Sequence, residues 1–256
     1  MYALEIAART GRSVTALYVV YPNEGVENNV YDAFFVDNYV QERLISMKKW
    51  ARKFTKSPHM KDVKINIECQ IGFPVSTIAQ AAKELGASII VMGTTGASGL
   101  RGVLLGSVAA GVVAGSKTPV FVIPPKAVFR NEARFSFATD FKIPVSQDSL
   151  QVMREMLNLQ HSGLDVVHVL SDEDKQPNAP AEKALSERLG SIPHNFHYLH
   201  NPNIVRAIQN FLEATDCNGL VAVAHERGLL QKLFGKSVSR ALAQQAKVPI
   251  LVLHDA

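Results

Sequence analysis

Residues 88–96 read Ser-Ile-Ile-Val-Met-Gly-Thr-Thr-Gly, and a second small-residue pair, Gly106-Ser107, follows after nine further residues. The apolar run before Gly93 is typical of a buried strand, whereas residues 108–117 are small and favour a helix. The glycines therefore fall where a strand ends and a helix begins. That junction is the usual place for a phosphate site in an open parallel sheet.

The spacing of these glycines has a chemical interpretation. Gly93 and Gly96 lack a Cβ atom, so the backbone can approach a ligand closely, and successive N–H groups can form a concave anion nest. Gly106 and Ser107 would add the N–H groups of a helix start and a hydroxyl. The intervening loop must leave and return, so the two clusters would bracket an extended polyphosphate. A glycine-rich turn followed by a helix cap is the alternative, since isolated glycine motifs are weak signals.

Residues 89–123 resemble the nucleotide-binding members of the universal stress protein family. Those proteins carry a strand ending in Met-Gly, then Gly-x2-Gly-x9-Gly-Ser, a helix, a proline and a last apolar strand. The matching residues here are Met92-Gly93, Gly96, Gly106-Ser107, Pro119 and 120–123.

This resemblance implies a flavodoxin-like or adenine-nucleotide-hydrolase-like α/β fold with a five-stranded parallel sheet that binds ATP or a related adenine nucleotide. It places Val19, on the second strand, at the adenine. The full set of nucleotide contacts that it implies is Val19, Met92, Gly93, Gly96, Gly106, Ser107 and Val108.

The chain also repeats itself at a shift of about 130 residues. Ser107 falls on Ser237, and the apolar stretch 120–123 falls on 250–253. Because strand and helix patterns alternate, we expect parallel sheets covered on both faces, in two tandem domains spanning 1–126 and 133–256. In the second repeat we expect strands at 134–139, 164–170, 194–199, 219–224 and 250–253, and helices at 147–160, 181–189, 204–214 and 237–246.

The second repeat is predicted to be degenerate. Val223, Glu226 and Lys236 take the three glycine positions of the motif, and a carboxylate beside a phosphate is repulsive. Three nearby histidines do not indicate a metal site, because alternation along a strand puts His197 on the face opposite His194 and His200. We therefore expect no metal centre and one nucleotide per chain.

The bulk composition narrows the class of protein. The chain has 256 residues, of which 47% are hydrophobic and 20% charged, with a net charge of +4. No basic stripe suggests nucleic acid, and no apolar run approaches membrane-spanning length. Two cysteines, far apart in the sequence, fit a reducing compartment. We expect a soluble cytoplasmic protein that binds neither nucleic acid nor membrane.

An aromatic-rich insert, residues 21–40, precedes a helical pattern at 40–54. The positions that would face the core have helical spacing and leave a basic outer face. They are Leu44, Ile45, Met47 or Lys48, Trp50 or Ala51, and Phe54. A partner-binding surface built from the insert is the alternative interpretation.

These patterns favour a nucleotide-binding stress-response or regulatory module. The last strands of the two repeats are apolar and need cover, so we expect them to pair, within one chain as a pseudo-dimer or in a homo-oligomer. One alternative is slow ATP hydrolysis or phosphoryl transfer at the same site, with Mg²⁺ and a water-positioning group that the sequence does not identify. A nucleotide-free interaction scaffold is the other.

The first repeat is predicted to lack one strand. Its pattern starts with a helix at 2–10 and a strand at 14–20, so the counterpart of strand 134–139, and of the Asp140 that follows it, would lie before Met1. In the family this strand is central, and an empty central slot would leave two rows of backbone groups unpaired, at about 1–3 kcal/mol each when buried.

A chain extended upstream in the reading frame by roughly 15 residues, enough for one strand at ~3.3 Å per residue and its turn, should therefore be more stable to heat and bind ATP more tightly than residues 1–256. Thermal unfolding and calorimetric titration of the two proteins test this. Equal values for both would show that the repeat alignment at the start of the chain is wrong.

Overall fold

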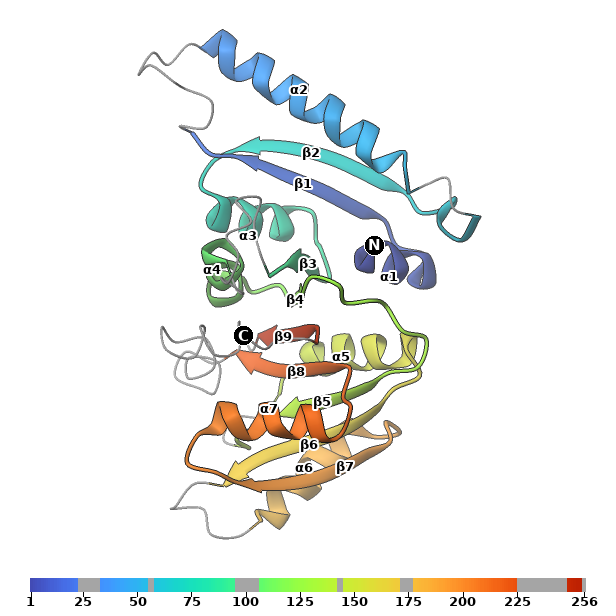
Figure 1. The fold of residues 1–256 in the computed structure, drawn as a ribbon, viewed down its shortest axis with the longest axis vertical. Coiled ribbons are helices and arrows are strands. Elements are labelled where there is room, and N and C mark those ends of the chain that lie inside the picture. The colour runs from blue at the N-terminus through green and yellow to red at the C-terminus, as the bar shows by residue number, and fades with distance from the viewer. Residues whose placement is uncertain are drawn as a thin grey trace. The chain divides into compact units, whose positions relative to one another are not determined.

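The computed structural model of the protein describes residues 1–22, 33–54, 58–94, 106–141, 145–170, 177–224 and 248–254. Within it the chain divides into two compact units, Met1–Leu85 and Gly86–Ala256. Figure 1 colours the elements of both units in chain order.

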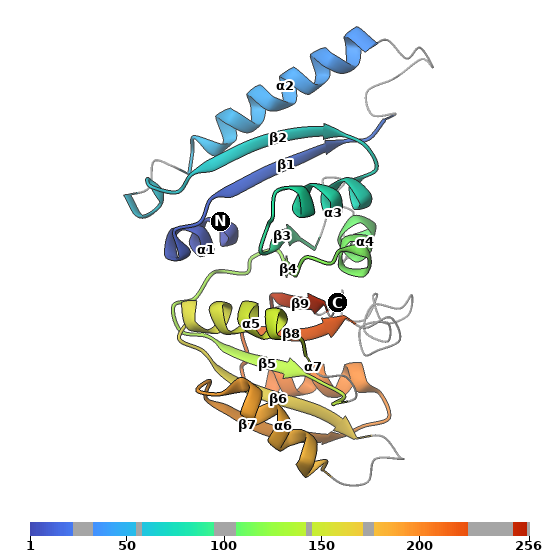
Figure 2. The ribbon, with the colours of Figure 1, turned by 180° about the vertical axis from the view of Figure 1, so that it is seen from behind.

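The first unit is a parallel pair of strands with helices on both faces. Its elements are α1 (Tyr2–Thr10), β1 (Val14–Val20), α2 (Ala33–Ala51), the 3-10 helix η1 (Pro58–Met60), β2 (Ile65–Ile71) and α3 (Pro74–Glu84). β1 and β2 pair from Val14 with Ile65 to Val20 with Ile71. Ile65 packs against the core that holds α1 and also lines a groove with the end of α2, so α1 and α2 share a face of the pair. Figures 1 and 2 show α3 on the β1 side of the pair, away from α2.

Local sequence sets the ends of these helices. Helix α1 stops at Gly11, whose φ of 67° is left-handed, a conformation that costs glycine little. Helix α3 starts with Pro74, which has no N–H group to leave unpaired in the first turn. A small core of Leu4, Ala7, Met60 and Val63 fixes α1 against η1.

The second unit contains a seven-stranded sheet with the order β3-β4-β9-β8-β5-β6-β7. Its strands are β3 (Ile90–Gly93), β4 (Val120–Ile123), β5 (Arg134–Ala138), β6 (Gly163–Leu170), β7 (His194–His200), β8 (Gly219–Ala224) and β9 (Ile250–His254). Its helices are α4 (Ser107–Gly115), α5 (Gln147–Leu159), α6 (Ala179–Leu189) and α7 (Ile204–Ala214). Strand β5 is central in the second repeat, because it pairs in parallel with β8 on one side and β6 on the other.

The predicted pairing of the two last strands is confirmed. β4 and β9 run antiparallel, with Phe121 opposite Leu251, and both of these side chains are 0% exposed. All other neighbouring strands of this sheet are parallel. One antiparallel contact therefore joins the last strand of the first repeat to the last strand of the second.

Among its described residues the first repeat has four strands instead of five, as the repeat alignment predicts, and these strands do not form one sheet. Its four strands form two pairs, β1 with β2 and β3 with β4, in two separate sheets. The physical reason lies in the comparison with the second repeat, where β5 bridges β8 and β6 by hydrogen bonds on both edges. Within residues 1–124 the structure describes no strand in the corresponding position.

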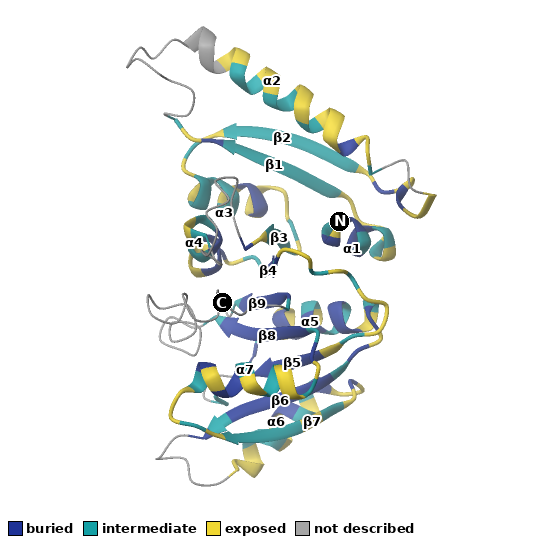
Figure 3. Ribbon diagram, viewed as in Figure 1, coloured by how far each residue is buried: buried dark blue, intermediate teal, exposed yellow. Residues whose placement is uncertain are grey.

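Most other elements match the sequence pattern, with two exceptions. Helix α2 begins at Ala33 rather than near Val40, because residues 33–39 contain no glycine or proline to stop it. Ile45 was predicted to face the core but is 66% exposed. Of the alternatives Trp50 and Ala51, Trp50 is 48% exposed and Ala51 is buried. Figure 3 shows that exposed positions recur along α2. The predicted helix at 237–246 lies outside the described residues. No helix in the described ranges is both long and apolar enough to cross a bilayer.

A tight contact across the sheet gives a test of this packing. A Cβ atom added at Gly219 on β8 would lie 2.1 Å from the ring of Phe135, its cross-strand neighbour on β5, which is 1% exposed. Gly219→Ala should therefore lower the free energy of unfolding by about 1–3 kcal/mol through overpacking.

Gly163→Ala is the matched control. It also replaces the first residue of a strand, β6, but its Cβ would meet only the Pro193 carbonyl oxygen at 3.7 Å, an ordinary contact. Denaturant unfolding of both variants checks the prediction, and equal losses at the two positions would contradict it.

Candidate functional site

The loop between β3 and α4 closes on itself at its base. Strand β3 ends at Gly93, and the buried Thr94 follows it. The Thr94 N–H donates to the Ile123 carbonyl at 3.2 Å, and the Gly106 N–H donates to the Thr94 carbonyl at 2.6 Å. The two ends of the loop are thus tied together at the carboxyl ends of β3 and β4. This agrees with the expectation that the loop begins and ends at the same place on the sheet.

The start of helix α4 has the properties of an anion-binding terminus. Its N-cap, Gly106, has an extended backbone with φ −60° and ψ 155°, and Ser107 is exposed. The first turn contains no acidic side chain, so no carboxylate of that turn competes for its N–H groups. Unpaired N–H groups and the helix dipole favour a phosphate or carboxylate at such a position.

The predicted contact residues divide between the two units. Met92, Gly93, Gly106, Ser107 and Val108 lie together around the tied base of the loop in the second unit. Val19 is the sixth residue of β1 and half-buried, and it belongs to the first unit.

Gly96 lies outside the described residues, as do Glu226 and Lys236 of the second repeat. The role of Thr94 could not be predicted from the glycine motif, because this residue acts through its backbone N–H and carbonyl groups.

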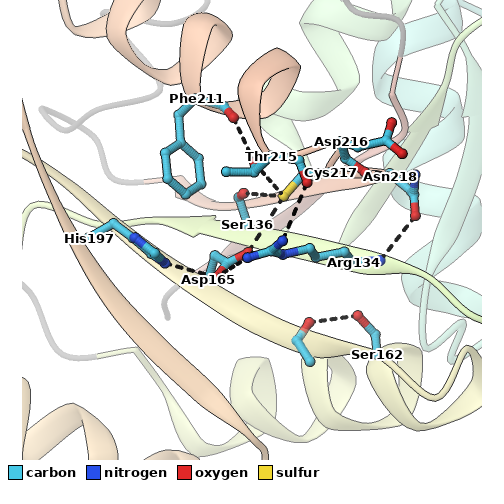
Figure 4. Close-up of polar contacts among 11 residues, drawn as sticks. Arg134, Ser136, Ser162, Asp165, His197, Phe211, Thr215, Asp216, Cys217 and Asn218 are labelled. Atoms are coloured by element: carbon cyan, nitrogen blue, oxygen red, sulfur yellow. Dashed lines mark hydrogen bonds and ion pairs between the residues drawn. The ribbon is translucent and has the colours of Figure 1, made fainter.

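A second polar cluster lies near the amino ends of the strands (Figure 4). The Asp165 carboxylate on β6, 2% exposed, accepts hydrogen bonds from Arg134 Nε at 2.5 Å and Nη2 at 3.1 Å. It also pairs with His197 Nε2 on β7 at 2.9 Å. Cys217, just before β8, lies with its Sγ atom 3.7 Å from the same carboxylate. The cluster ties three strands and one loop together.

Electrostatics explains the ionisation of the two buried groups. Burial alone would raise the pKa of Asp165, but hydrogen bonds from Arg134 and His197 outweigh it and hold that pKa below its ordinary value. Burial raises the pKa of the Cys217 thiol. The cluster therefore contains an ionised carboxylate and a protonated thiol.

This arrangement is suited to stability rather than to nucleophilic chemistry. A thiol with a raised pKa is a weak nucleophile, and Cys217 contacts Ser136, Thr215 and the Asp165 carboxylate, with no hydrogen bond to the imidazole of His197. In open α/β sheets ligands bind at the carboxyl ends of strands. We therefore assign the cluster to the framework and the β3–α4 loop to the candidate site.

The other histidines of β7 face the opposite way, as alternation predicted. His194 contacts the Ser186 hydroxyl of α6 at 2.6 Å, whereas the His197 ring packs 4.8 Å from that of Phe211 on α7. Within the described residues no cluster of three or more His, Cys, Asp or Glu side chains has the geometry of a metal site.

A mainly parallel sheet whose strands alternate with helices defines an α/β protein. The universal stress protein family model matches residues 1–124 and again residues 137–254. The chain belongs to the universal stress protein family, in a tandem form.

Individual relatives agree with this assignment. A universal stress protein of Methanocaldococcus jannaschii is 35% identical over 129 residues, which are 48% of this chain and 71% of the relative. One from Mycobacterium tuberculosis is 27% identical over 222 residues, 80% of this chain and 75% of the relative. The crystal structure of a universal stress protein from Archaeoglobus fulgidus has the same fold, with a TM-score of 0.72, 22% identity and coverage of 99% of this chain and 91% of that one.

The framework role of Asp165 is testable by substitution. Asp165→Asn should lower the free energy of unfolding by about 2 kcal/mol at neutral pH, because it weakens the charge-assisted hydrogen bonds that the buried carboxylate accepts; water solvates the Arg134 guanidinium, which is 48% exposed, and limits the loss. The folded-state pKa of Asp165 is lowered, so this stabilisation is present above the unfolded-state pKa of about 3.9 and is lost as the pH falls through the folded-state pKa.

Denaturant unfolding of both proteins across this pH range measures the effect, and the difference between them should shrink below about pH 4. Asp62→Asn, at an exposed carboxylate, is the control and should change stability by less than about 1 kcal/mol. A similar loss in both variants, or a difference that does not vary with pH, would refute the assigned role.

Proposed function

We propose that this chain is a cytoplasmic, nucleotide-binding stress-response or regulatory protein that holds ATP or a related adenine nucleotide at the β3–α4 loop. Met92, Gly93 and Gly96 would line one side of the phosphates. Gly106, Ser107 and Val108 would present the helix terminus on the other, and Val19 would contact the adenine.

One observation carries the proposal. The hydrogen bond from Gly106 to Thr94 brings the end of a parallel strand and the start of a helix to the base of a single loop, with no acidic residue in the first helical turn. Family membership and the complete Gly-x2-Gly-x9-Gly-Ser spacing support the choice of a nucleotide over a simpler anion.

The residues at the loop base fit a polyphosphate chemically. N–H groups and a serine hydroxyl are donors, and glycine lets the phosphate approach the backbone. When bound, the nucleotide would bring a polyphosphate and an associated Mg²⁺ ion to this loop. Neither of the two cysteines, Cys69 and Cys217, forms a disulfide, which fits a reducing compartment.

Gly106→Val tests the site directly. The backbone angles of Gly106 are open to any residue, so the added side chain changes bulk at the phosphate position without straining the main chain. ATP affinity measured by calorimetry should fall about tenfold or more, in line with the loss of one close charge-assisted contact.

Gly115→Val, an exposed glycine at the other end of α4, is the matched control and should bind ATP like the wild type. The stoichiometry should be one nucleotide per chain, and a value of two would contradict the predicted degeneracy of the second repeat. Unchanged affinity in folded Gly106→Val would reject the site. No binding by the wild type would favour a nucleotide-free scaffold, and Mg²⁺-dependent turnover would favour an enzyme.

A further inference from the structure

A groove in the first unit runs between helix α2 and strand β2. It is lined by Lys48, Ala51, Arg52, Ile65 and Ile67 and has a volume of about 210 Å³. The two isoleucines are alternate residues of β2 and so lie on one face of the strand. The groove therefore has an apolar floor and a cationic wall.

The cationic wall continues beyond the groove. Lys48, Lys49, Arg52 and Lys53 are all exposed and fall within the last turns of α2 and the residue pair after it. No acidic residue occurs between Leu44 and Phe54. Lysine and arginine at a helix carboxyl end offset the helix dipole, and here Lys48 also borders the apolar floor of the groove.

Strand β2 adds a second kind of contact at the same place. It is seven residues long, and among the described residues its one partner strand is β1, so β2 is the edge of its sheet. An edge strand presents a row of backbone N–H and C=O groups that can pair with an added strand. Its outer edge thus lies beside the groove that Ile65 and Ile67 floor.

We propose that the α2–β2 groove is a docking site for an extended acidic segment of a partner protein, which adds as a strand to the edge of β2. Backbone pairing with β2 supplies affinity, and alternate side chains of the segment enter the groove. Its carboxylates face Lys48 and Arg52, whose charge selects an acidic partner over a basic one.

The shape of the surface favours a peptide over other anionic partners. The groove is smaller than the roughly 300–1,000 Å³ of small-molecule pockets, but it can accept individual side chains. A membrane-surface helix needs one continuous apolar face, whereas the exposed apolar residues of α2, Ile45 and Trp50, are five positions apart and so point about 140° apart around the helix.

Fluorescein-labelled peptides provide the test. They are as long as β2 and alternate aspartate with valine, leucine or phenylalanine, with lysine replacing aspartate in the matched controls. Fluorescence anisotropy should show an aspartate peptide binding at least about tenfold more tightly than its lysine counterpart. Hydrogen exchange should slow for backbone amides within Ile65–Ile71 when that peptide is bound.

The variant Lys48→Glu with Arg52→Glu should weaken this binding by about tenfold or more. Lys83→Glu with Lys117→Glu is the charge-matched control, since both lysines are exposed and lie outside the groove, and it should bind like the wild type.

Several results would overturn the proposal. They are no binding of any aspartate peptide, equal loss in the two charge variants, protection of amides on another strand, or Lys48-dependent binding to phosphatidylserine vesicles without peptide binding. A homodimer that forms through the β2 edge, detected by sedimentation and broken by the Lys48 and Arg52 changes, would assign the surface to a second copy instead.

Discussion

The antiparallel contact between β4 and β9 is the interaction on which the second unit depends. Without it, β4 and β9 would each end a sheet with an apolar, unpaired edge, which proteins normally cover. With it, Phe121 and Leu251 are fully buried, and the pair β3–β4 becomes part of a seven-stranded sheet. The base of the β3–α4 loop consequently belongs to a large framework rather than to an isolated pair of strands. Hydrogen bonds from Thr94 N–H to Ile123 and from Gly106 N–H to Thr94 fix this base.

The two ends of the sheet carry different kinds of polar chemistry. At the amino ends, the buried Asp165 joins Arg134, His197 and Cys217 in a hydrogen-bonded network. At the carboxyl end of β3, the helix start at Ser107 has no acidic side chain in its first turn and remains suited to an anion. A buried carboxylate costs stability unless it is paired, so the need to stabilise the fold accounts for the network around Asp165. That need does not account for the loop at the carboxyl end of β3.

Local sequence signals were sufficient to predict the bounds of elements that depend only on their own residues. Strand β1, helix α7 and strand β8 begin and end where the pattern predicts, and α7 starts where Asn203 caps the N–H of Arg206. The Asp165 network was missed because its partners are 31, 32 and 52 residues away in the sequence. Ile45 was misassigned because helical periodicity fixes relative directions around α2 but not which direction meets the sheet.

The outer edge strands of the two repeats are protected against unwanted strand pairing in different ways. At the far edge of the large sheet, β7 places His194 against α6 and His197 against Asp165 and α7, so its side chains are engaged from both faces. The corresponding edge strand of the first unit, β2, instead borders a groove with an apolar floor and two cations. Lysine beside an edge discourages unspecific strand pairing, and the same positive charge leaves the edge open to an acidic strand. Protection against aggregation and selection of a partner can therefore arise from the same two side chains, Lys48 and Arg52.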